Sequence, residues 1–254
     1  MVLVPQQATP TPALTHMIIP RIFHYIWLGS KPMPPIMEQW RSKWEHLHPT
    51  WKTKVWRGAA DTTILQWRDE LVVSRRPNYL MGCPTIAKRS DVWRYDLLEQ
   101  LGGVYLDTDF EPIKNIEPIV EDKSAFAGLC VTKYNWSKIR PEGDLKTEIG
   151  CSIIGATAHH PWLQDLFNNA AKQDLVAPLS LAFPYMTRIT ANHPEVHLFE
   201  PRIFYSVRWD EYTHLQSRYI KSPPREAYAV HRWSSLWFNN GIKSLPPGKL
   251  QSCH

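Results

Sequence analysis

TIAKRSDVWRYDLLEQLGGVYLDTDF, residues 85–110, predicts a helix, a tight turn and a short strand in direct succession. Apolar residues recur in its first part at the spacing of one helix face, which favours a buried stripe; they are Ile86, Trp93, Leu97 and Leu101. Gly102 and Gly103 end this helix, because the residue just past the last turn usually needs a positive φ. Residues 104–106, Val-Tyr-Leu, then form an apolar strand.

Two carboxylates follow this strand. Asp107 and Asp109 are two residues apart, so both side chains can point to the same side where the strand ends. Converging carboxylates are costly unless a positive charge neutralises them, and Mn²⁺ or Mg²⁺ suits such hard oxygen ligands. The pattern indicates a metal–diphosphate site, while a solvated turn is the plainer interpretation of Asp-Thr-Asp.

Asp91 and Arg94 lie three residues apart on the same predicted helix, and therefore on one face of it. Such a pair is usually a surface salt bridge, which contributes little. Because the helix leads directly into the strand before Asp107, the pair is also within reach of the predicted metal site.

The remaining sequence alternates between strand-like and helix-like segments. Strands are expected at residues 18–28 and 51–56, and helices at 36–47 and 61–73. This alternation favours an α/β fold with a mostly parallel sheet covered on both faces, in which ligands bind at the carboxyl ends of the strands. Residues 1–16, which three prolines interrupt, are expected to be a disordered tail, and residues 17–254 a single domain.

The composition is that of a globular protein, with 43% hydrophobic and 21% charged residues. Four widely spaced cysteines exclude a zinc ribbon and argue against a disulfide framework. The net charge of +5 suits a phosphorylated ligand but is too diffuse for nucleic acid. Most of the 12 tryptophans are expected in the core.

No run of about 18 apolar residues occurs, so no transmembrane helix is predicted. We therefore expect a soluble, cytoplasmic protein. A shortened form of a membrane-associated or Golgi-lumenal protein would have the same sequence features.

Four segments, in the same order, resemble glycosyltransferase family 32, which includes yeast mannosyltransferases and shares its catalytic core with the clostridial glucosylating toxins. The stretch SDVWRYDLLEQLGGVYLDTDF, residues 90–110, resembles the DXD region of that family. The other segments are IPRIFHYIWLG at 19–29, CSIIGATAHHPWL at 151–163 and AVHRWSSLW at 229–237.

The resemblance implies a GT-A fold with a Rossmann-like nucleotide-binding sheet and an acceptor-side region at about residues 125–225. It implies transfer of a hexose (mannose, glucose, galactose or GlcNAc) from a UDP- or GDP-linked donor, with retention of anomeric configuration. The acceptor, whether glycan, lipid or small molecule, is not implied.

The resemblance also implies roles for single residues. Trp27 would stack on the nucleobase, and Asp91 and Arg94 would hold the donor sugar. Asp109 and His231 would ligate the metal.

Three further residues complete the expected site. Asp107 would contact the donor, or the metal through water, and Trp237 would lie in a closing loop near the phosphates. Tyr105 is expected either to pack or to approach the donor. Cys151 and Leu236 depart from the family, which commonly has Asn and Ser at these places.

Two other functions fit parts of the sequence. An apolar strand before Asp-x-Asp also occurs in phosphohydrolases of the haloacid-dehalogenase kind, but Glu111 stands where that pattern needs Thr or Val. A non-catalytic carbohydrate-binding module would use exposed tryptophans and would not need the two aspartates.

Overall fold

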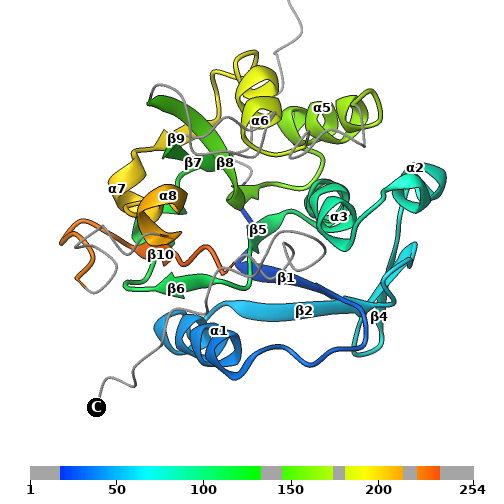
Figure 1. Ribbon diagram of the computed structural model, residues 1–254, viewed down its shortest axis with the longest axis horizontal. Coiled ribbons are helices and arrows are strands. Elements are labelled where there is room, and N and C mark those ends of the chain that lie inside the picture. The colour runs from blue at the N-terminus through cyan, green and yellow to red at the C-terminus, as the bar shows by residue number, and fades with distance from the viewer. Residues whose placement is uncertain (1–17, 133–144, 174–180, 214–221, 235–254) are drawn as a thin grey trace, which may run out of the picture.

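The computed structural model describes residues 18–132, 145–173, 181–213 and 222–234. These residues form an eight-stranded sheet in the order β4-β3-β2-β1-β5-β8-β7-β9 and a two-stranded sheet of β10 and β6 (Figure 1). The strands are β1 Ile22–Leu28, β2 Lys52–Gly58, β3 Ile64–Trp67, β4 Glu70–Val73, β5 Gly103–Leu106, β6 Phe110–Pro112, β7 Ala125–Thr132, β8 Lys146–Ala156, β9 His197–Phe199 and β10 Ala229–His231. The helices are α1 Pro35–Leu47, α2 Pro77–Gly82, α3 Ile86–Leu101, α4 Glu117–Val120, α5 Pro161–Ala170, α6 Phe183–Thr190, α7 Pro201–Phe204 and α8 Trp209–Thr213.

The expected α/β class is confirmed, but the sheet is mixed rather than mostly parallel. β1 pairs in parallel with β2 and β5, and β9 pairs in parallel with β7. The other neighbours in the sheet are antiparallel, including β5 with β8 and β8 with β7. The parallel centre therefore retains the expected carboxyl edge, where β1, β2 and β5 end together.

The helix expected at residues 61–73 is wrong, because this segment is the β3–β4 hairpin. Leu65 and Val72 are cross-strand partners and are buried, whereas the flanking Ile64 and Val73 are exposed. This alternation has the period of a strand rather than of a helix. A two-residue turn at positions 68–69 closes the hairpin, and its first residue, Arg68, has a φ of 52°.

The predicted end of α3 is confirmed. Gly102 and Gly103 have φ values of 63° and 96°, which other residues rarely adopt. The carbonyl of Gly102 accepts a hydrogen bond from Nε2 of His24 at 3.0 Å, and Nδ1 of His24 accepts one from the Trp56 indole at 2.9 Å. Burial lowers the pKa of His24 to about 3, so a neutral imidazole links β1 and β2 to the turn before β5.

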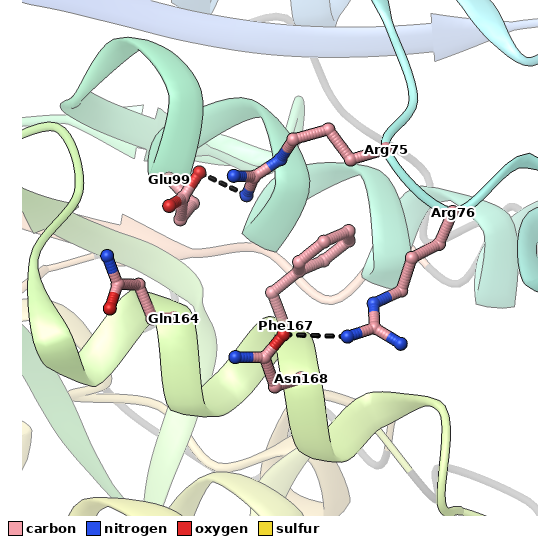
Figure 2. Close-up of a pocket in the computed structure, with 6 residues that line it drawn as sticks. All are labelled: Arg75, Arg76, Glu99, Gln164, Phe167 and Asn168. Atoms are coloured by element: carbon pink, nitrogen blue, oxygen red, sulfur yellow. Dashed lines mark hydrogen bonds and ion pairs between the residues drawn. The ribbon is translucent and has the colours of Figure 1, made fainter.

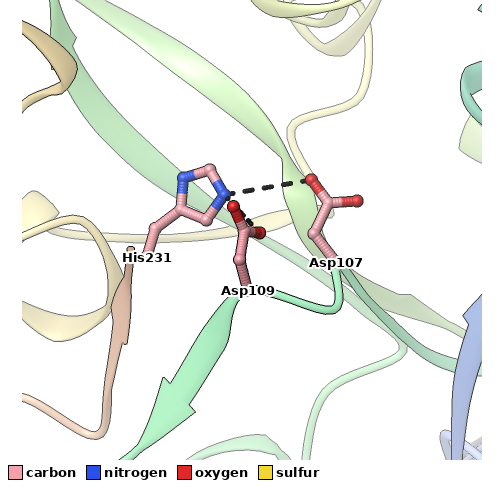
Figure 3. A group of neighbouring side chains, drawn as sticks. All are labelled: Asp107, Asp109 and His231. Carbon is pink, nitrogen blue, oxygen red and sulfur yellow. Dashed lines mark hydrogen bonds and ion pairs between the residues drawn. The ribbon is translucent and has the colours of Figure 1, made fainter. Parts of the chain in front are cut away.

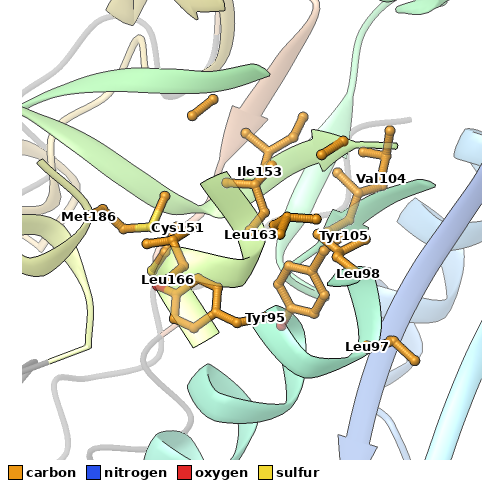
Figure 4. Close-up of a cluster of buried hydrophobic side chains, with 14 of the residues drawn as sticks. Tyr95, Leu97, Leu98, Val104, Tyr105, Cys151, Ile153, Leu163, Leu166 and Met186 are labelled. Carbon is orange, nitrogen blue, oxygen red and sulfur yellow. The ribbon is translucent and has the colours of Figure 1, made fainter. Parts of the chain in front are cut away.

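Both faces of the central strands are covered. α3 packs on β1, β5 and β8, where side chains of α3, α5 and β8 form the core cluster in Figure 4. Phe23, the neighbour of His24 in β1, points the opposite way and packs on Trp44 of α1 and on Trp51, with ring centroids 5.0 and 4.5 Å apart. The expectation that tryptophans fill the core is confirmed for Trp44, Trp56, Trp93 and Trp162, which are fully buried.

The far end of α3 is tied to α5 and to the chain before α2. Arg75 pairs with Glu99, and Arg76 donates to the Asn168 side chain at 2.7 Å, with Phe167 of α5 between them (Figure 2). Glu99 lies eight residues after Asp91, which is about 12 Å along a helix. Arg75 therefore neutralises Glu99 near the end of α3, and Arg76 connects the chain before α2 to α5. Both contacts lie away from the end of β5, where Asp107 and Asp109 follow.

Among the described residues, none of the helices is both long enough and apolar enough to cross a lipid bilayer.

Candidate functional site

Asp107, Asp109 and His231 come together at the end of β5 (Figure 3). Antiparallel pairing of β10 with β6 places His231 opposite Phe110, the residue after Asp109. Nε2 of His231 lies 3.1 Å from Oδ1 of Asp109 and 4.0 Å from Oδ2 of Asp107. One potential ligand atom from each residue lies within 4.8 Å of the others, so the predicted grouping is present.

The segment after β10 wraps around Asp109. Oδ2 of Asp109 accepts hydrogen bonds from the backbone N–H of Ser234 at 2.7 Å and from the Ser234 hydroxyl at 2.9 Å. The backbone carbonyl of Asp109 accepts one from the N–H of Arg232 at 2.9 Å. Although burial favours the protonated acid, His231 and Ser234 lower the pKa of Asp109 to about 2. Asp109 is therefore a carboxylate at neutral pH.

Sequence reasoning missed Ser234, which lies within the matched segment at 229–237. Trp233, just before it, has a φ of 47°, which is uncommon outside glycine and asparagine. The Trp233 indole donates to the carbonyl of Val207 at 2.8 Å, which anchors this bend. Backbone conformations of this kind collect at functional sites, but none of the features used for the sequence prediction pointed to one here.

Arg94 joins Asp91 to Asp107. Its guanidinium donates to Oδ1 of Asp91 at 2.6 Å and to the carbonyl of Cys151 at 2.7 Å, and it lies 3.5 Å from Oδ1 of Asp107. Arg94 is only 4% exposed, so the pair is not a surface salt bridge. Burial raises the pKa of Asp91 to about 6, although Arg94 acts in the opposite direction.

Tyr105 is buried beneath this network. Its hydroxyl donates to Oδ1 of Asp107 at 2.6 Å, and the Arg94 guanidinium lies 4.7 Å from the centre of its ring. Tyr105 therefore packs and orients Asp107. A direct contact between Tyr105 and the donor stays a prediction.

Trp27 lies near the end of β1, at the same edge of the sheet. His24 is in register with Tyr105, so Trp27 stands level with the residue after Asp107. The side chain is partly exposed, and its indole donates to the carbonyl of Lys31 at 2.7 Å. This position leaves Trp27 outside the core and accessible to a ligand at the carboxyl edge.

Two of the expected features fall outside the described residues, namely Trp237 and the departure at Leu236. The other departure, Cys151, is a buried free thiol in β8 whose backbone carbonyl binds Arg94. Its contribution to the site therefore comes from the backbone, which any residue at this position supplies.

The residues present fit a hard divalent cation. Two carboxylates and an imidazole meet within coordination reach, and oxygen and nitrogen donors of this kind suit Mn²⁺ and Mg²⁺. The positive charge of Arg94 also lies near the site, but its Nη atoms contact Asp91, Cys151 and Asp107 rather than Asp109. A second positive charge beside Asp109 and His231 is therefore compatible with the site.

Residues 35–126 match the family described as glycosyltransferase sugar-binding region containing DXD motif. Inositol phosphoceramide mannosyltransferase 3 of Schizosaccharomyces pombe is 23% identical over 223 residues, covering 86% of this chain and 49% of the relative. Human alpha-1,4-N-acetylglucosaminyltransferase is 22% identical over 192 residues, covering 69% of this chain and 49% of the relative. The chain thus spans about half the length of these curated relatives.

Two solved structures are similar over much of the chain. The PaToxG glycosyltransferase has a TM-score of 0.47 at 15% identity and covers 70% of each chain. The galactosyltransferase LgtC has a TM-score of 0.45 at 10% identity and covers 92% of this chain and 97% of its own.

Proposed function

Because residues 35–126 match the family of glycosyltransferase sugar-binding regions that contain a DXD motif, we propose that this chain is a metal-dependent glycosyltransferase with a GT-A fold. It would move a hexose from a UDP- or GDP-linked donor to a glycan, lipid or small-molecule acceptor. The observation that carries this proposal is the meeting of Asp107, Asp109 and His231 at the carboxyl end of β5.

Asp109 and His231 would hold the cation, with Asp107 beside them. When bound, the cation neutralises the diphosphate and stabilises the charge on the leaving group. Ser234 keeps the Asp109 carboxylate ionised and fixed through two hydrogen bonds, so that its orientation is set before the donor arrives. Such preorganisation spares the site a reorganisation cost during the reaction.

The donor sugar would lie against Asp91, and the nucleobase against Trp27. Arg94 contacts the carboxylates of both Asp91 and Asp107, which holds acceptors for sugar or ribose hydroxyls beside the proposed metal site. The partly exposed Trp27 offers a flat ring at the same carboxyl edge, which supports stacking on a base.

Retention of anomeric configuration and the acceptor-side region at about residues 125–225 are also part of the proposal. The described residues on that side include β7, β8 and α5 to α8. Proton NMR of the sugar released by slow hydrolysis reports its anomeric form directly. An inverted product would refute retention while leaving the transferase proposal intact.

A thermal-shift screen tests the proposal. Nucleotide sugars (GDP-mannose and UDP-linked glucose, galactose and GlcNAc) are compared with and without Mn²⁺, since a ligand that binds only the folded state stabilises it by about 2.7 kcal/mol at a hundredfold excess over Kd. For a chain of this size, that corresponds to a rise in Tm of about 5–10 °C. We expect one of these donors to raise the Tm, and to do so only when Mn²⁺ is present.

Hydrolysis of the same donor without acceptor separates a transferase from a sugar-binding module. Slow, Mn²⁺-dependent release of free sugar is expected. If the donor binds but no sugar is released with any metal, the binding module is favoured. If inorganic phosphate is released from a phosphate ester in the absence of a nucleotide sugar, the phosphohydrolase is favoured.

A further inference from the structure

The β7–β8 ladder is irregular beside the candidate site. Ala127 pairs with Ile154, but the next residue, Gly128, pairs with Gly150, so residues 151–153 of β8 bulge away from β7. A bulge leaves backbone groups unpaired and redirects them, and bulges are frequent beside active sites.

The carbonyls of this bulge hold two residues of the candidate site. The Cys151 carbonyl accepts a hydrogen bond from the guanidinium of Arg94 at 2.7 Å, and the Ser152 carbonyl accepts one from the N–H of Asp107 at 2.8 Å. The positions of Arg94 and Asp107 therefore depend on the shape of the bulge.

Tyr205, which follows α7, fills the bulge from the side of β7. A Cβ atom on Gly128 would lie 2.7 Å from Cε2 of Tyr205, and one on Gly150 would collide with its hydroxyl end. The two glycines thus leave the space that the ring occupies. Its hydroxyl oxygen accepts the N–H of Ser152 at 3.1 Å, which satisfies the amide that the irregular ladder frees.

The same ring contacts the metal-binding side of the site. It packs edge-on against Phe110, next to Asp109, and against His231, with centroid distances of 5.5 and 5.7 Å. Tyr205 is only 2% exposed, so these contacts fix it from several directions. One buried side chain therefore connects the bulge to the metal-binding residues.

We propose that Tyr205 is a positioning residue for the proposed sugar transfer, whose hydroxyl sets the β8 bulge and through it the places of Arg94 and Asp107. The proposal rests on the proposed function of the site. Asp109 has its own bonds to Ser234 and His231, which do not pass through the bulge. Removal of the hydroxyl should therefore disturb the sugar side of the site more than binding of metal and diphosphate.

Tyr205→Phe tests this inference, with Tyr185→Phe as the matched control. Tyr185 is equally buried, and its hydroxyl also bonds to the backbone, at the carbonyl of Leu166. We expect Tyr205→Phe to lower kcat for donor hydrolysis about tenfold relative to Tyr185→Phe, because an unpaired buried amide is costly enough to shift the bulge. The Kd for nucleoside diphosphate with Mn²⁺ should change less than about twofold.

Hydrogen exchange gives a readout that does not depend on activity. The amides of Ser152 and Asp107 should exchange faster in Tyr205→Phe than in Tyr185→Phe. Equal exchange in the two variants overturns the proposal, whether or not wild type turns over a nucleotide sugar. If wild type turns over none, the proposed function fails, and exchange alone decides whether Tyr205 holds the bulge.

A second variant approaches the same contact from β7. In Gly128→Ala, the added methyl group must push the Tyr205 ring aside. We expect the same pattern, with lower kcat and faster exchange at Ser152. A kcat equal to that of Tyr185→Phe in both Tyr205→Phe and Gly128→Ala overturns the positioning role.

Discussion

Substituting Asp109 by Asn should remove metal binding while the protein stays folded. A carboxamide has the shape of the carboxylate, so its oxygen can still accept both hydrogen bonds from Ser234, and its NH₂ group can face Nε2 of His231. The fall in the pKa of Asp109 from 3.8 to about 2 corresponds to about 2 kcal/mol in favour of the charged form. Because Asn keeps the hydrogen bonds and so recovers part of this stabilisation, we expect the substitution to lower the unfolding free energy by about 1–2 kcal/mol.

The loss of metal affinity should be much larger. One of the two carboxylates at the site becomes neutral, and changes to groups that only support a metal ligand already cost about 10–100-fold in affinity. We expect Kd for Mn²⁺ in the presence of nucleoside diphosphate to rise at least about a hundredfold, equivalent to about 2.7 kcal/mol. Donor hydrolysis should fall below detection.

Asp122→Asn is the matched control, because Asp122 is an exposed aspartate whose partner is the adjacent Lys123. Mn²⁺ binding is measured by electron paramagnetic resonance, and unfolding by denaturant titration. Full turnover after chelator treatment, or equal Mn²⁺ affinity in Asp109→Asn and Asp122→Asn, would refute the metal site. Unfolding of Asp109→Asn at neutral pH would instead refute the stability argument.

Three further outcomes follow from the same geometry. Trp27→Ala should raise KM for the donor about 5–150-fold with little change in kcat, because base stacking of about 1–3 kcal/mol acts in ground and transition states alike; an unchanged KM in steady-state kinetics would return Trp27 to a purely structural role. Arg94→Lys should lose donor hydrolysis, because an ammonium does not reproduce the planar contacts to Asp91 and the Cys151 carbonyl; wild-type kcat in this variant would contradict the role given to Arg94. The pKa of Asp91 is raised to about 6 from 3.8, so Asp91 takes up a proton in the folded state between these values. Its own contribution to stability should therefore increase as pH falls from about 6 to about 4, by at most about 1.4 kcal/mol per pH unit, while His24, whose pKa is lowered to about 3, acts in the opposite direction. In denaturant unfolding, the free energy of unfolding of wild type minus that of Asp91→Asn should therefore rise as pH falls across this range, and a difference that does not change with pH would contradict the assignment to Asp91.

The local features of the site were predictable because they depend on neighbouring residues. Helical spacing, the glycine pair at 102–103 and the apolar residues 104–106 are each short-range signals, and the structure confirms α3, its end and β5. The proximity of Asp107 to Asp109 follows from their spacing alone. His231 is different, since it lies 122 positions from Asp109, and only the resemblance to a family predicted that the two would meet.

The direction of several strands was not predictable from the pattern. An apolar strand has the same alternation whether its neighbour runs parallel or antiparallel, and β8 returns beside β5 in the antiparallel sense. The hairpin of β3 and β4 was missed for a related reason: each strand has only four residues and one buried side chain, Leu65 in β3 and Val72 in β4, so neither strand shows a clear alternation in the sequence. Pairing with a neighbouring strand decides such segments.

The α3–β5 unit, the two carboxylates at its end and the i,i+3 relation of Asp91 to Arg94 follow from the order of the residues alone. The burial of this ion pair, the contact of Ser234 with Asp109 and the entry of Tyr205 into the bulge of β8 depend on how distant segments pack. Backbone periodicity is encoded by residues a few positions apart, whereas burial and long-range hydrogen bonds involve segments that meet only after folding. Gly128 and Gly150 illustrate the difference, because their lack of a side chain has meaning only beside the ring of Tyr205.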